Sequence, residues 1–369
     1  MEAEYPLPRR PTRTVQVGNI TIGGGAPITI QSMTKTPTVD IDATVAQIHL
    51  LEDVGCDIIR LGVPDTVSAQ ALGEIKRQIK IPLVADIHFN HELALIALAG
   101  GVDKLRLNPG NLKRPEHVKA VVSAAAERKV PIRIGVNNGS IDAKVRTRFP
   151  FTPLGNAQAL VESALTHVRL LEELNFHEIV ISLKASDVVT TVLAYRLMLE
   201  VRDYPLHIGI TEAGLPPVGL IRSSVGVGQL LGEGIGDTLR ISLTADPLEE
   251  VEAAWHILRA LNLRKAGVLL TSCPTCARCD VDFNPIVTTI QQRLNPLDRR
   301  LRSEGKSLHV AVMGCEVNGP GEARDADVGI AGGKHYGILF SRGEVLGKVP
   351  EANMIDALLN EVDKIAKEL

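Results

Sequence analysis

A short apolar run followed by a helical stretch recurs along the first two thirds of the chain. Amphipathic segments such as TVAQIHLLEDVG and AQALVESALTHVRLLEELN separate the runs. Eight such strands alternating with helices predict a (β/α)8 (TIM) barrel, and the absence of GxGxxG after the first run disfavours a doubly wound open sheet. The runs are PITIQSM (27–33), DIIRLGV (57–63), IPLVADIHF (81–89), KLRLNPG (104–110), VPIRIGVNN (130–138), HEIVISLKA (177–185), PLHIGIT (205–211) and TLRISLT (238–244).

The barrel pattern has a beginning, one long interval and an end. A hairpin-like segment, TVQVGNITIGGG, precedes the first run, and a long interval at 141–156 follows the fifth. Such an interval belongs to the catalytic face of a barrel, so we expect it beside a site. The pattern stops after VEAAWHILRALNLRKAG, and the remaining segments predict the order β-α-β-β-β-α. We therefore predict a TIM barrel at 1–265 and a small α+β domain at 266–369.

Composition narrows the possible partners and the compartment. The 40 basic and 43 acidic residues leave a formal net charge of −3, which gives no reason to expect nucleic acid or an anionic membrane as a partner. No apolar run approaches the ~18 residues of a membrane span, and the N-terminus lacks a signal peptide's apolar region. We expect a cytoplasmic protein, in which the five cysteines stay reduced.

Polar residues follow the late positions of strand after strand. Residues at i and i+2 share a strand face, and active sites of TIM barrels lie at the carboxyl ends of the strands. These side chains should therefore converge on one mouth. They are Arg60, Asp86, His88, Arg106, Asn108, Arg133, Asn137, Lys184, Glu212, Arg240 and Ser242.

The predicted mouth is cationic, although the chain as a whole is slightly acidic. Five arginine and lysine side chains face two carboxylates, Asp86 and Glu212, which leaves a charge of about +3. Arginine forks bind phosphate and diphosphate well. A single arginine at a strand end would more often form an ion pair in the barrel, but the repetition over six strands indicates an anion site.

Four cysteines gather in the C-terminal part of the chain. Cys273 and Cys276 form a CxxC, Cys279 repeats the spacing, and Cys315 lies in MGCEVNGPGE. Structural zinc, an iron–sulfur cluster and a redox dithiol remain possible, and the turn-rich loops favour the cluster only modestly. Its fourth ligand would be Cys279 or a non-cysteine group nearby. Cys56, in EDVGCDIIR, is predicted to be a buried packing thiol.

These motifs resemble the bacterial 4-hydroxy-3-methylbut-2-enyl diphosphate synthases of the non-mevalonate isoprenoid pathway. SCPTCAR and VMGCEVNGPGE carry the resemblance together with RLGVPD, ADIHFN, LRLNPGN, RIGVNNGS and GITEAG, over nearly the whole chain. The resemblance implies a [4Fe–4S] cluster held by Cys273, Cys276, Cys315 and Glu322. The chain departs from the family pattern SCPxCGR at Ala277 and Cys279. Because NGPGE is intact, we favour Glu322 over Cys279 as the fourth ligand.

The resemblance also implies the reaction, which is the reductive ring opening and dehydration of 2-C-methyl-D-erythritol 2,4-cyclodiphosphate. Glu212 is the candidate proton-handling or substrate-orienting carboxylate, and Glu322 joins it through the cluster. No nicotinamide or flavin fingerprint is present, so electrons should come from reduced flavodoxin or ferredoxin. The alternatives are a pterin-binding TIM-barrel transferase with a structural zinc domain and a zinc-stabilised binding module that is not an enzyme.

The order of the two domains predicts a homodimer with cross-subunit active sites. The last barrel helix runs from the catalytic face to the opposite face, and a linker of roughly five residues spans at most about 18 Å of the ~30 Å back to the mouth. A two-fold pair in which each small domain caps the partner's barrel avoids this problem. The family resemblance points to the same arrangement.

Overall fold

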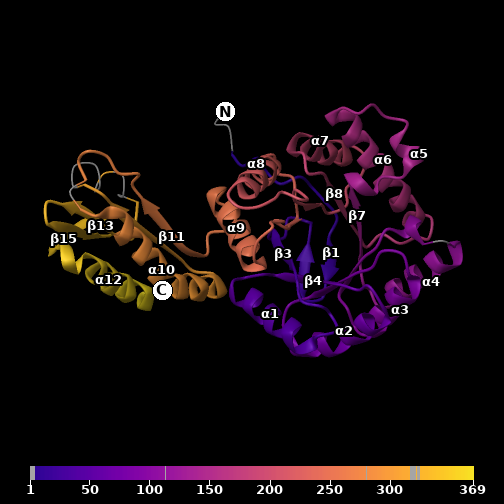
Figure 1. Cartoon of the computed structure of the whole chain (residues 1–369), viewed down its shortest axis with the longest axis horizontal. Coiled ribbons are helices and arrows are strands. Elements are labelled where there is room, and N and C mark those ends of the chain that lie inside the picture. The colour runs from indigo at the N-terminus through magenta and orange to yellow at the C-terminus, as the bar shows by residue number, and fades with distance from the viewer. Residues whose placement is uncertain (1–4, 113, 280, 316–320, 322–324) are drawn as a thin grey trace. The chain divides into compact units, whose positions relative to one another are not determined.

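The computed structural model describes residues 5–112, 114–279, 281–315, 321 and 325–369. The chain divides into two compact units, Met1–Leu263 and Arg264–Leu369. Figure 1 shows the helices that surround the strands of the first unit and the smaller sheet of the second.

Eight parallel strands form the barrel of the first unit, and each lies within one of the eight predicted runs. Their order in the sheet is β8-β7-β6-β5-β4-β3-β10-β9. A bridge between Ile181 of β8 and Leu206, next to β9, brings the two ends of the sheet together. The predicted TIM barrel is therefore confirmed. The strands are β3 (Thr29–Met33), β4 (Ile58–Gly62), β5 (Leu83–Asp86), β6 (Lys104–Arg106), β7 (Ile132–Asn137), β8 (Ile179–Lys184), β9 (His207–Ile208) and β10 (Thr238–Leu239).

Helices follow the strands, and several begin at a side chain that caps the first turn. Asp65 accepts from Ser68 N, Asp187 from Val189 N and Thr190 N, and Thr152 from Gly155 N, which satisfies helix donors that otherwise lack a partner. The helices are α1 (Ile41–Asp53), α2 (Thr66–Gln78), α3 (His91–Ala99), η1 (Pro109–Asn111), α4 (Pro115–Glu127), η2 (Asn138–Ser140), α5 (Ala143–Arg146), α6 (Pro153–Glu172), α7 (Val188–Leu199), α8 (Val218–Gly232) and α9 (Pro247–Ala260).

The long interval after the fifth barrel strand is structured around Arg146 at the end of α5. Its guanidinium donates to the carbonyl oxygens of Phe149 (3.2 Å) and Pro150 (2.9 Å) and to Asn156 Oδ1 (2.8 Å). One side chain thus ties three points of the segment together at the start of α6.

An N-terminal hairpin closes the barrel floor. Strands β1 (Val15–Val17) and β2 (Ile20–Ile22) pair antiparallel, as predicted. Val15, Val17 and Ile22 pack on Ile58, Val84 and Val180, which stand at the beginnings of barrel strands. The end of the barrel opposite the mouth is therefore filled by aliphatic side chains.

The second unit is a five-stranded sheet of mixed direction in the order β11-β12-β13-β14-β15. Its chain order is β-α-β-β-β-β-α, one strand more than predicted, because 328–333, 336–341 and 344–350 all pair in succession after β12. The predicted order is wrong in this respect, and the predicted α+β class is right. The elements are β11 (Gly267–Ser272), α10 (Phe283–Glu304), β12 (Ser307–Met313), β13 (Val328–Gly333), β14 (Tyr336–Ser341), β15 (Glu344–Pro350), η3 (Glu351–Asn353) and α12 (Met354–Glu368).

One face of this sheet carries the core of the unit. Leu294 of α10 and Leu358 of α12 pack with Val310, Val312 and other strand residues in a single apolar cluster. The parallel pair β11 and β12 ends side by side, with Ser272 opposite Val312. The loops that follow these two strands therefore begin next to each other. Across the described residues, no helix is both long and apolar enough to span a membrane.

Candidate active site

A cavity of about 120 Å³ opens at the carboxyl ends of the barrel strands. It brings together every predicted substrate-binding residue except Asn108. The lining residues are Arg60, Asp86, His88, Arg106, Arg133, Gly135, Asn137, Ser182, Lys184, Thr211, Arg240 and Ser242. The sequence did not single out Thr211 as a site residue, although it is the last residue of the seventh predicted run, PLHIGIT (205–211).

Asp86 holds two arginines at one side of the mouth. Its carboxylate lies 3.7 Å from Arg60 Nε and 3.4 Å from Arg106 Nη1, and Arg106 Nη1 is 3.0 Å from His88 Nδ1. Burial raises the pKa of Asp86, but Arg60, His88 and Arg106 outweigh it and keep the pKa well below its usual range. Asp86 is therefore ionised and orients the guanidinium groups around it.

The backbone of Gly135 in β7 is hydrogen-bonded by two side chains, one from β6 and one from the residues that follow it. Arg106 Nη2 (2.9 Å) and Asn108 Nδ2 (3.0 Å) donate to its carbonyl oxygen, and its N–H donates to Asn108 Oδ1 at 2.9 Å. Asn108 thus acts on the strand backbone and is not part of the cavity lining. A Cβ at 135 would meet Arg106 Nε at 3.0 Å and Ser182 Oγ at 3.1 Å, so only glycine leaves Arg106 its place.

Arg133 and Lys184 are two buried cations of the cavity lining. Arg133 Nη1 donates to Ser182 Oγ at 2.9 Å, whereas its Nε and Nη2 have no hydrogen-bond partner among the described residues. Burial lowers the pKa of Lys184 well below its usual value, and Arg133 and Arg240 add to the effect. Donors and cations left without an acceptor are those that a bound anion would satisfy.

Gly209, just after β9, makes room for Lys184. Gly209 follows β9 with φ +154°, and a Cβ there would lie 2.3 Å from the carbonyl oxygen of Arg240 and 2.9 Å from Lys184 Nζ. A side chain at 209 would displace Lys184, which explains why PLHIGIT needs glycine at this position.

Glu250 is a second carboxylate of the site that sequence reasoning missed. It is buried in the first turn of α9, its Oε2 lies 3.4 Å from Arg240 Nη2, and its Oε1 accepts from Leu243 N at 2.9 Å. The available signal was the acidic pair in DPLEEVEAA, which follows the eighth predicted run (238–244), but Glu250 lies on a helix and not at a strand end.

Glu212 lies at the edge of this arrangement. It is exposed, has a φ of +53°, and does not line the cavity. The carboxylate that pairs with a mouth cation opposite Asp86 is thus Glu250, while Glu212 stands on the loop between β9 and α8. Any part played by Glu212 requires it to act from the rim.

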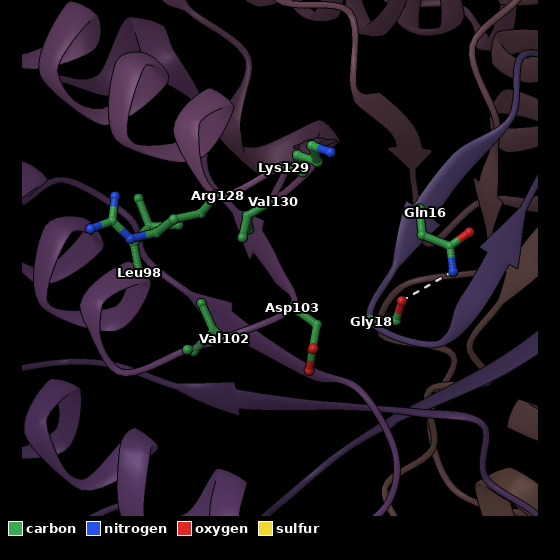
Figure 2. Close-up of a pocket in the computed structure, with 9 residues that line it drawn as sticks. Gln16, Gly18, Leu98, Val102, Asp103, Arg128, Lys129 and Val130 are labelled. Carbon is green, nitrogen blue, oxygen red and sulfur yellow. Dashed lines mark hydrogen bonds between the residues drawn. The ribbon is translucent and has the colours of Figure 1, made fainter.

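A larger cavity, of about 530 Å³, lies at the opposite end of the barrel (Figure 2). Gln16 and Gly18 of the N-terminal hairpin, Asp103, Arg128 and Lys129 line it. Asp103 is already paired with Lys76 at 2.6 Å and accepts from Leu83 N at 2.7 Å. Because the amino ends of barrel strands serve stability and the carboxyl ends serve chemistry, the smaller cationic cavity is the candidate site.

Cysteines of the second unit gather at the adjacent ends of β11 and β12. Cys273 directly follows β11, and Gly314 directly follows β12. A Cβ on Gly314 would lie 3.2 Å from Cys273 Sγ and 3.1 Å from Cys279 Sγ, so both sulfurs converge on one point. Thr275 N donates to Cys273 Sγ at 3.2 Å in a turn where Thr275 has φ +65°.

Arg278 connects the other two cysteines. Interactions with the Cys276 and Cys315 thiols raise the pKa of Arg278, so both sulfurs lie near its guanidinium. In turn, the backbone N–H and the side chain of Arg278 lower the pKa of Cys276, which favours its thiolate. Among the described side chains, no three Cys, His, Asp or Glu are close enough to hold one metal ion. Glu322 lies outside the described residues.

Cys56 takes no part in this gathering. It is buried in the barrel unit, its Sγ donates to the carbonyl oxygen of Ile58 at 3.2 Å, and burial raises its pKa to about 12. The predicted packing role is confirmed.

Comparison with known proteins covers both units. The model of the GcpE TIM-barrel domain matches residues 12–255, and that of the GcpE protein C-terminal domain matches residues 269–364. A Geobacter sulfurreducens protein is 55% identical over 357 residues, covering 97% of this chain and 98% of its own. One from Geobacillus thermodenitrificans is 52% identical over 360 residues, covering 98% of this chain and 94% of its own.

Both relatives are named 4-hydroxy-3-methylbut-2-en-1-yl diphosphate synthase (flavodoxin). A pterin-binding transferase with a zinc domain does not account for the match to the C-terminal domain, so the synthase interpretation prevails over that alternative. From its barrel to its cysteine-bearing sheet, the chain belongs to the GcpE family of 4-hydroxy-3-methylbut-2-en-1-yl diphosphate synthases.

Proposed function

We propose that the chain reduces and opens 2-C-methyl-D-erythritol 2,4-cyclodiphosphate to 4-hydroxy-3-methylbut-2-enyl diphosphate, with two electrons and loss of water. The names of its relatives support this reaction. We assign substrate binding to residues 1–265 and the redox cofactor to residues 266–369.

The observation that carries the proposal is the cavity at the barrel mouth. Five cationic side chains line it, and only Asp86 among the lining residues is a carboxylate. A diphosphate brings the acceptors that this group lacks, and charge-assisted hydrogen bonds to several donors fix its orientation. The cations are Arg60, Arg106, Arg133, Lys184 and Arg240.

Other residues of the mouth position the substrate. Asp86 holds Arg60 and Arg106, and Asn108 holds the strand that carries Asn137. His88, Asn137 and Ser242 offer polar groups for the hydroxyl and phosphate oxygens. We propose Glu212, on the rim, as the carboxylate that handles a proton or orients the substrate.

The cysteine loops fit an iron–sulfur cofactor. The sulfurs of Cys273 and Cys279 converge at Gly314, and Arg278 favours the thiolate of Cys276; thiolates are the donors that such a cluster needs. We propose that Cys273, Cys276, Cys315 and Glu322 hold a [4Fe–4S] cluster. When bound, the cluster supplies electrons one at a time to the substrate.

Flavodoxin is the proposed electron donor. The relatives carry it in their names, and ferredoxin is the other carrier of this class. Reduced flavodoxin delivers single electrons, which matches a one-electron cluster.

A homodimer with cross-subunit sites is proposed for the assembly. The 14 residues of α9 carry the chain about 21 Å away from the mouth, and six residues separate α9 from β11. Exposed apolar side chains stand on loops that follow barrel strands, among them Phe89, Phe151 and Leu215. Such a rim favours a covering partner, here the small domain of the second copy.

Metal and sulfide analysis tests the function. Protein purified without oxygen should contain about four irons and four acid-labile sulfides per chain. Its absorption spectrum should change on addition of the cyclic diphosphate. Zinc without sulfide would overturn the proposal and revive the zinc-stabilised binding module.

A further inference from the structure

Two mouth arginines share a single thioether sulfur. Arg60 donates to Met33 Sδ from Nη2 at 2.8 Å and from Nε at 3.2 Å, and Arg240 Nη1 lies 3.8 Å from the same atom. Met33 is the last residue of β3, the strand between β4 and β10. Its residue pair across the β3–β4 ladder is Arg60 itself.

Each arginine also pairs with a carboxylate. Asp86 lies 3.7 Å from Arg60, and Glu250 lies 3.4 Å from Arg240. Burial, and to a lesser degree the charges of Arg240 and Arg106, lower the pKa of Arg60 to about 10. The guanidinium groups of Arg60 and Arg240 therefore repel each other. The side chain that contacts both, Met33, must therefore orient the two guanidinium groups without adding a further positive charge.

A thioether meets this requirement. Sulfur accepts weakly and carries no charge, so it can orient N–H groups while leaving the positive charge of the mouth intact. A carboxylate at position 33 would pair with both arginines and cancel charge that a diphosphate needs. An aliphatic residue of the same size would fill the space but give the N–H groups no acceptor.

From this contact we infer that Met33 is a positioning residue, which sets Arg60 and Arg240 for the diphosphate by accepting from both. The inference rests on the proposed function, because it takes the mouth arginines as the diphosphate ligands. It adds an uncharged sulfur acceptor to the cationic side of the mouth.

The test measures binding of inorganic diphosphate to the full-length protein by calorimetry. Met33→Leu keeps the volume and removes the acceptor, and it should bind about 5- to 10-fold more weakly, as for the loss of one modest hydrogen bond. Met33→Gln restores a neutral acceptor and should recover part of the affinity. Met33→Glu should bind worst. Met198→Leu, a fully buried methionine of α7, is the matched control and should bind like the wild type.

Turnover separates positioning from packing. Met33→Leu should raise the KM for the cyclic diphosphate while kcat and the unfolding midpoint change little. Binding of diphosphate by Met33→Leu within twofold of wild type would overturn the inference, as would failure of Met33→Gln to exceed Met33→Leu. If the wild type itself does not bind diphosphate, the proposed function fails, and that result is distinct from a loss confined to the Met33 variants.

Discussion

Arg106 Nη2 donates a hydrogen bond to the carbonyl oxygen of Gly135 at 2.9 Å, across the neighbouring strands β6 and β7. The missing side chain at 135 makes this contact possible, because a Cβ would stand 3.0 Å from Arg106 Nε. The mouth therefore depends on a glycine as much as on its cations.

Gly135→Ala tests this dependence. The methyl group should push Arg106 away from the carbonyl and from Asp86, weaken diphosphate binding, and cost about 1–3 kcal/mol of unfolding free energy through overpacking. Gly139→Ala, with open space around its Cα, should change neither. Calorimetric binding and denaturant unfolding measure the two effects, and unchanged affinity in Gly135→Ala would show that Arg106 is free to move.

Lys184→Ala should weaken binding of the substrate and leave the fold and the cluster intact. Loss of one charge-assisted contact costs roughly 1.5–3 kcal/mol, or about 10- to 150-fold in Kd. Because the pKa of Lys184 is depressed in the free mouth, anion binding should take up a proton, and affinity should fall as pH rises. Lys119→Ala, at an exposed site on α4, is the control, and equal affinities would remove Lys184 from the site.

The fourth cluster ligand can be decided by two variants. If Glu322 is the ligand, Cys279→Ser keeps a full complement of iron and sulfide and most activity, whereas Glu322→Ala loses activity and holds its cluster less firmly. Cys315→Ser serves as the reference for a lost cysteine ligand. The reverse pattern, with iron lost in Cys279→Ser alone, assigns the position to Cys279.

Mixing two inactive chains tests the cross-subunit site. A Lys184→Ala chain retains its cysteine domain, and a Cys315→Ser chain retains its barrel mouth. In a cross-capped mixed dimer, one of the two sites is wild type throughout, so activity should partly return. Subunit exchange, followed by mass spectrometry with one chain isotopically labelled, must accompany the assay. Exchange without activity would place each site within one chain.

Lys104 should make stability depend on pH. It is fully buried in β6, its Nζ has no hydrogen-bond partner among the described residues, and burial together with Arg133 and Arg60 holds its pKa well below the usual value. Between that value and about 10.4, the unfolded chain binds more protons, so stability rises with pH.

Lys104→Met should therefore stabilise the protein at pH 7, by roughly 1–4 kcal/mol, and the gain should shrink toward pH 10. Unfolding by denaturant at a series of pH values measures it, with the exposed Lys119→Met as control. A gain that does not vary with pH would contradict the titration and point to packing.

The barrel could be predicted from sequence because parallel strands buried on both sides appear as continuous apolar runs. Strand-end polarity likewise led to most of the cavity lining. Glu250 could not be predicted from strand-end polarity because it reaches the mouth from a helix. Met33 could not be predicted because the sequence of an apolar strand end does not show that its sulfur contacts two arginines. Asn108 was correctly placed near the mouth, but its amide contacts with the Gly135 backbone depend on strand register.

The valine and isoleucine side chains of the N-terminal hairpin fill the end of the barrel opposite the site, which leaves the carboxyl end of the strands as the entrance to the site. Val15, Val17 and Ile22 pack across the beginnings of barrel strands, at the end opposite the cations. In the proposed dimer, substrate and product would use the same cationic opening, and the covering domain would have to move away from it in each cycle. The turnover rate would then depend on the rate at which the covering domain opens as well as on the rate of electron transfer from the donor.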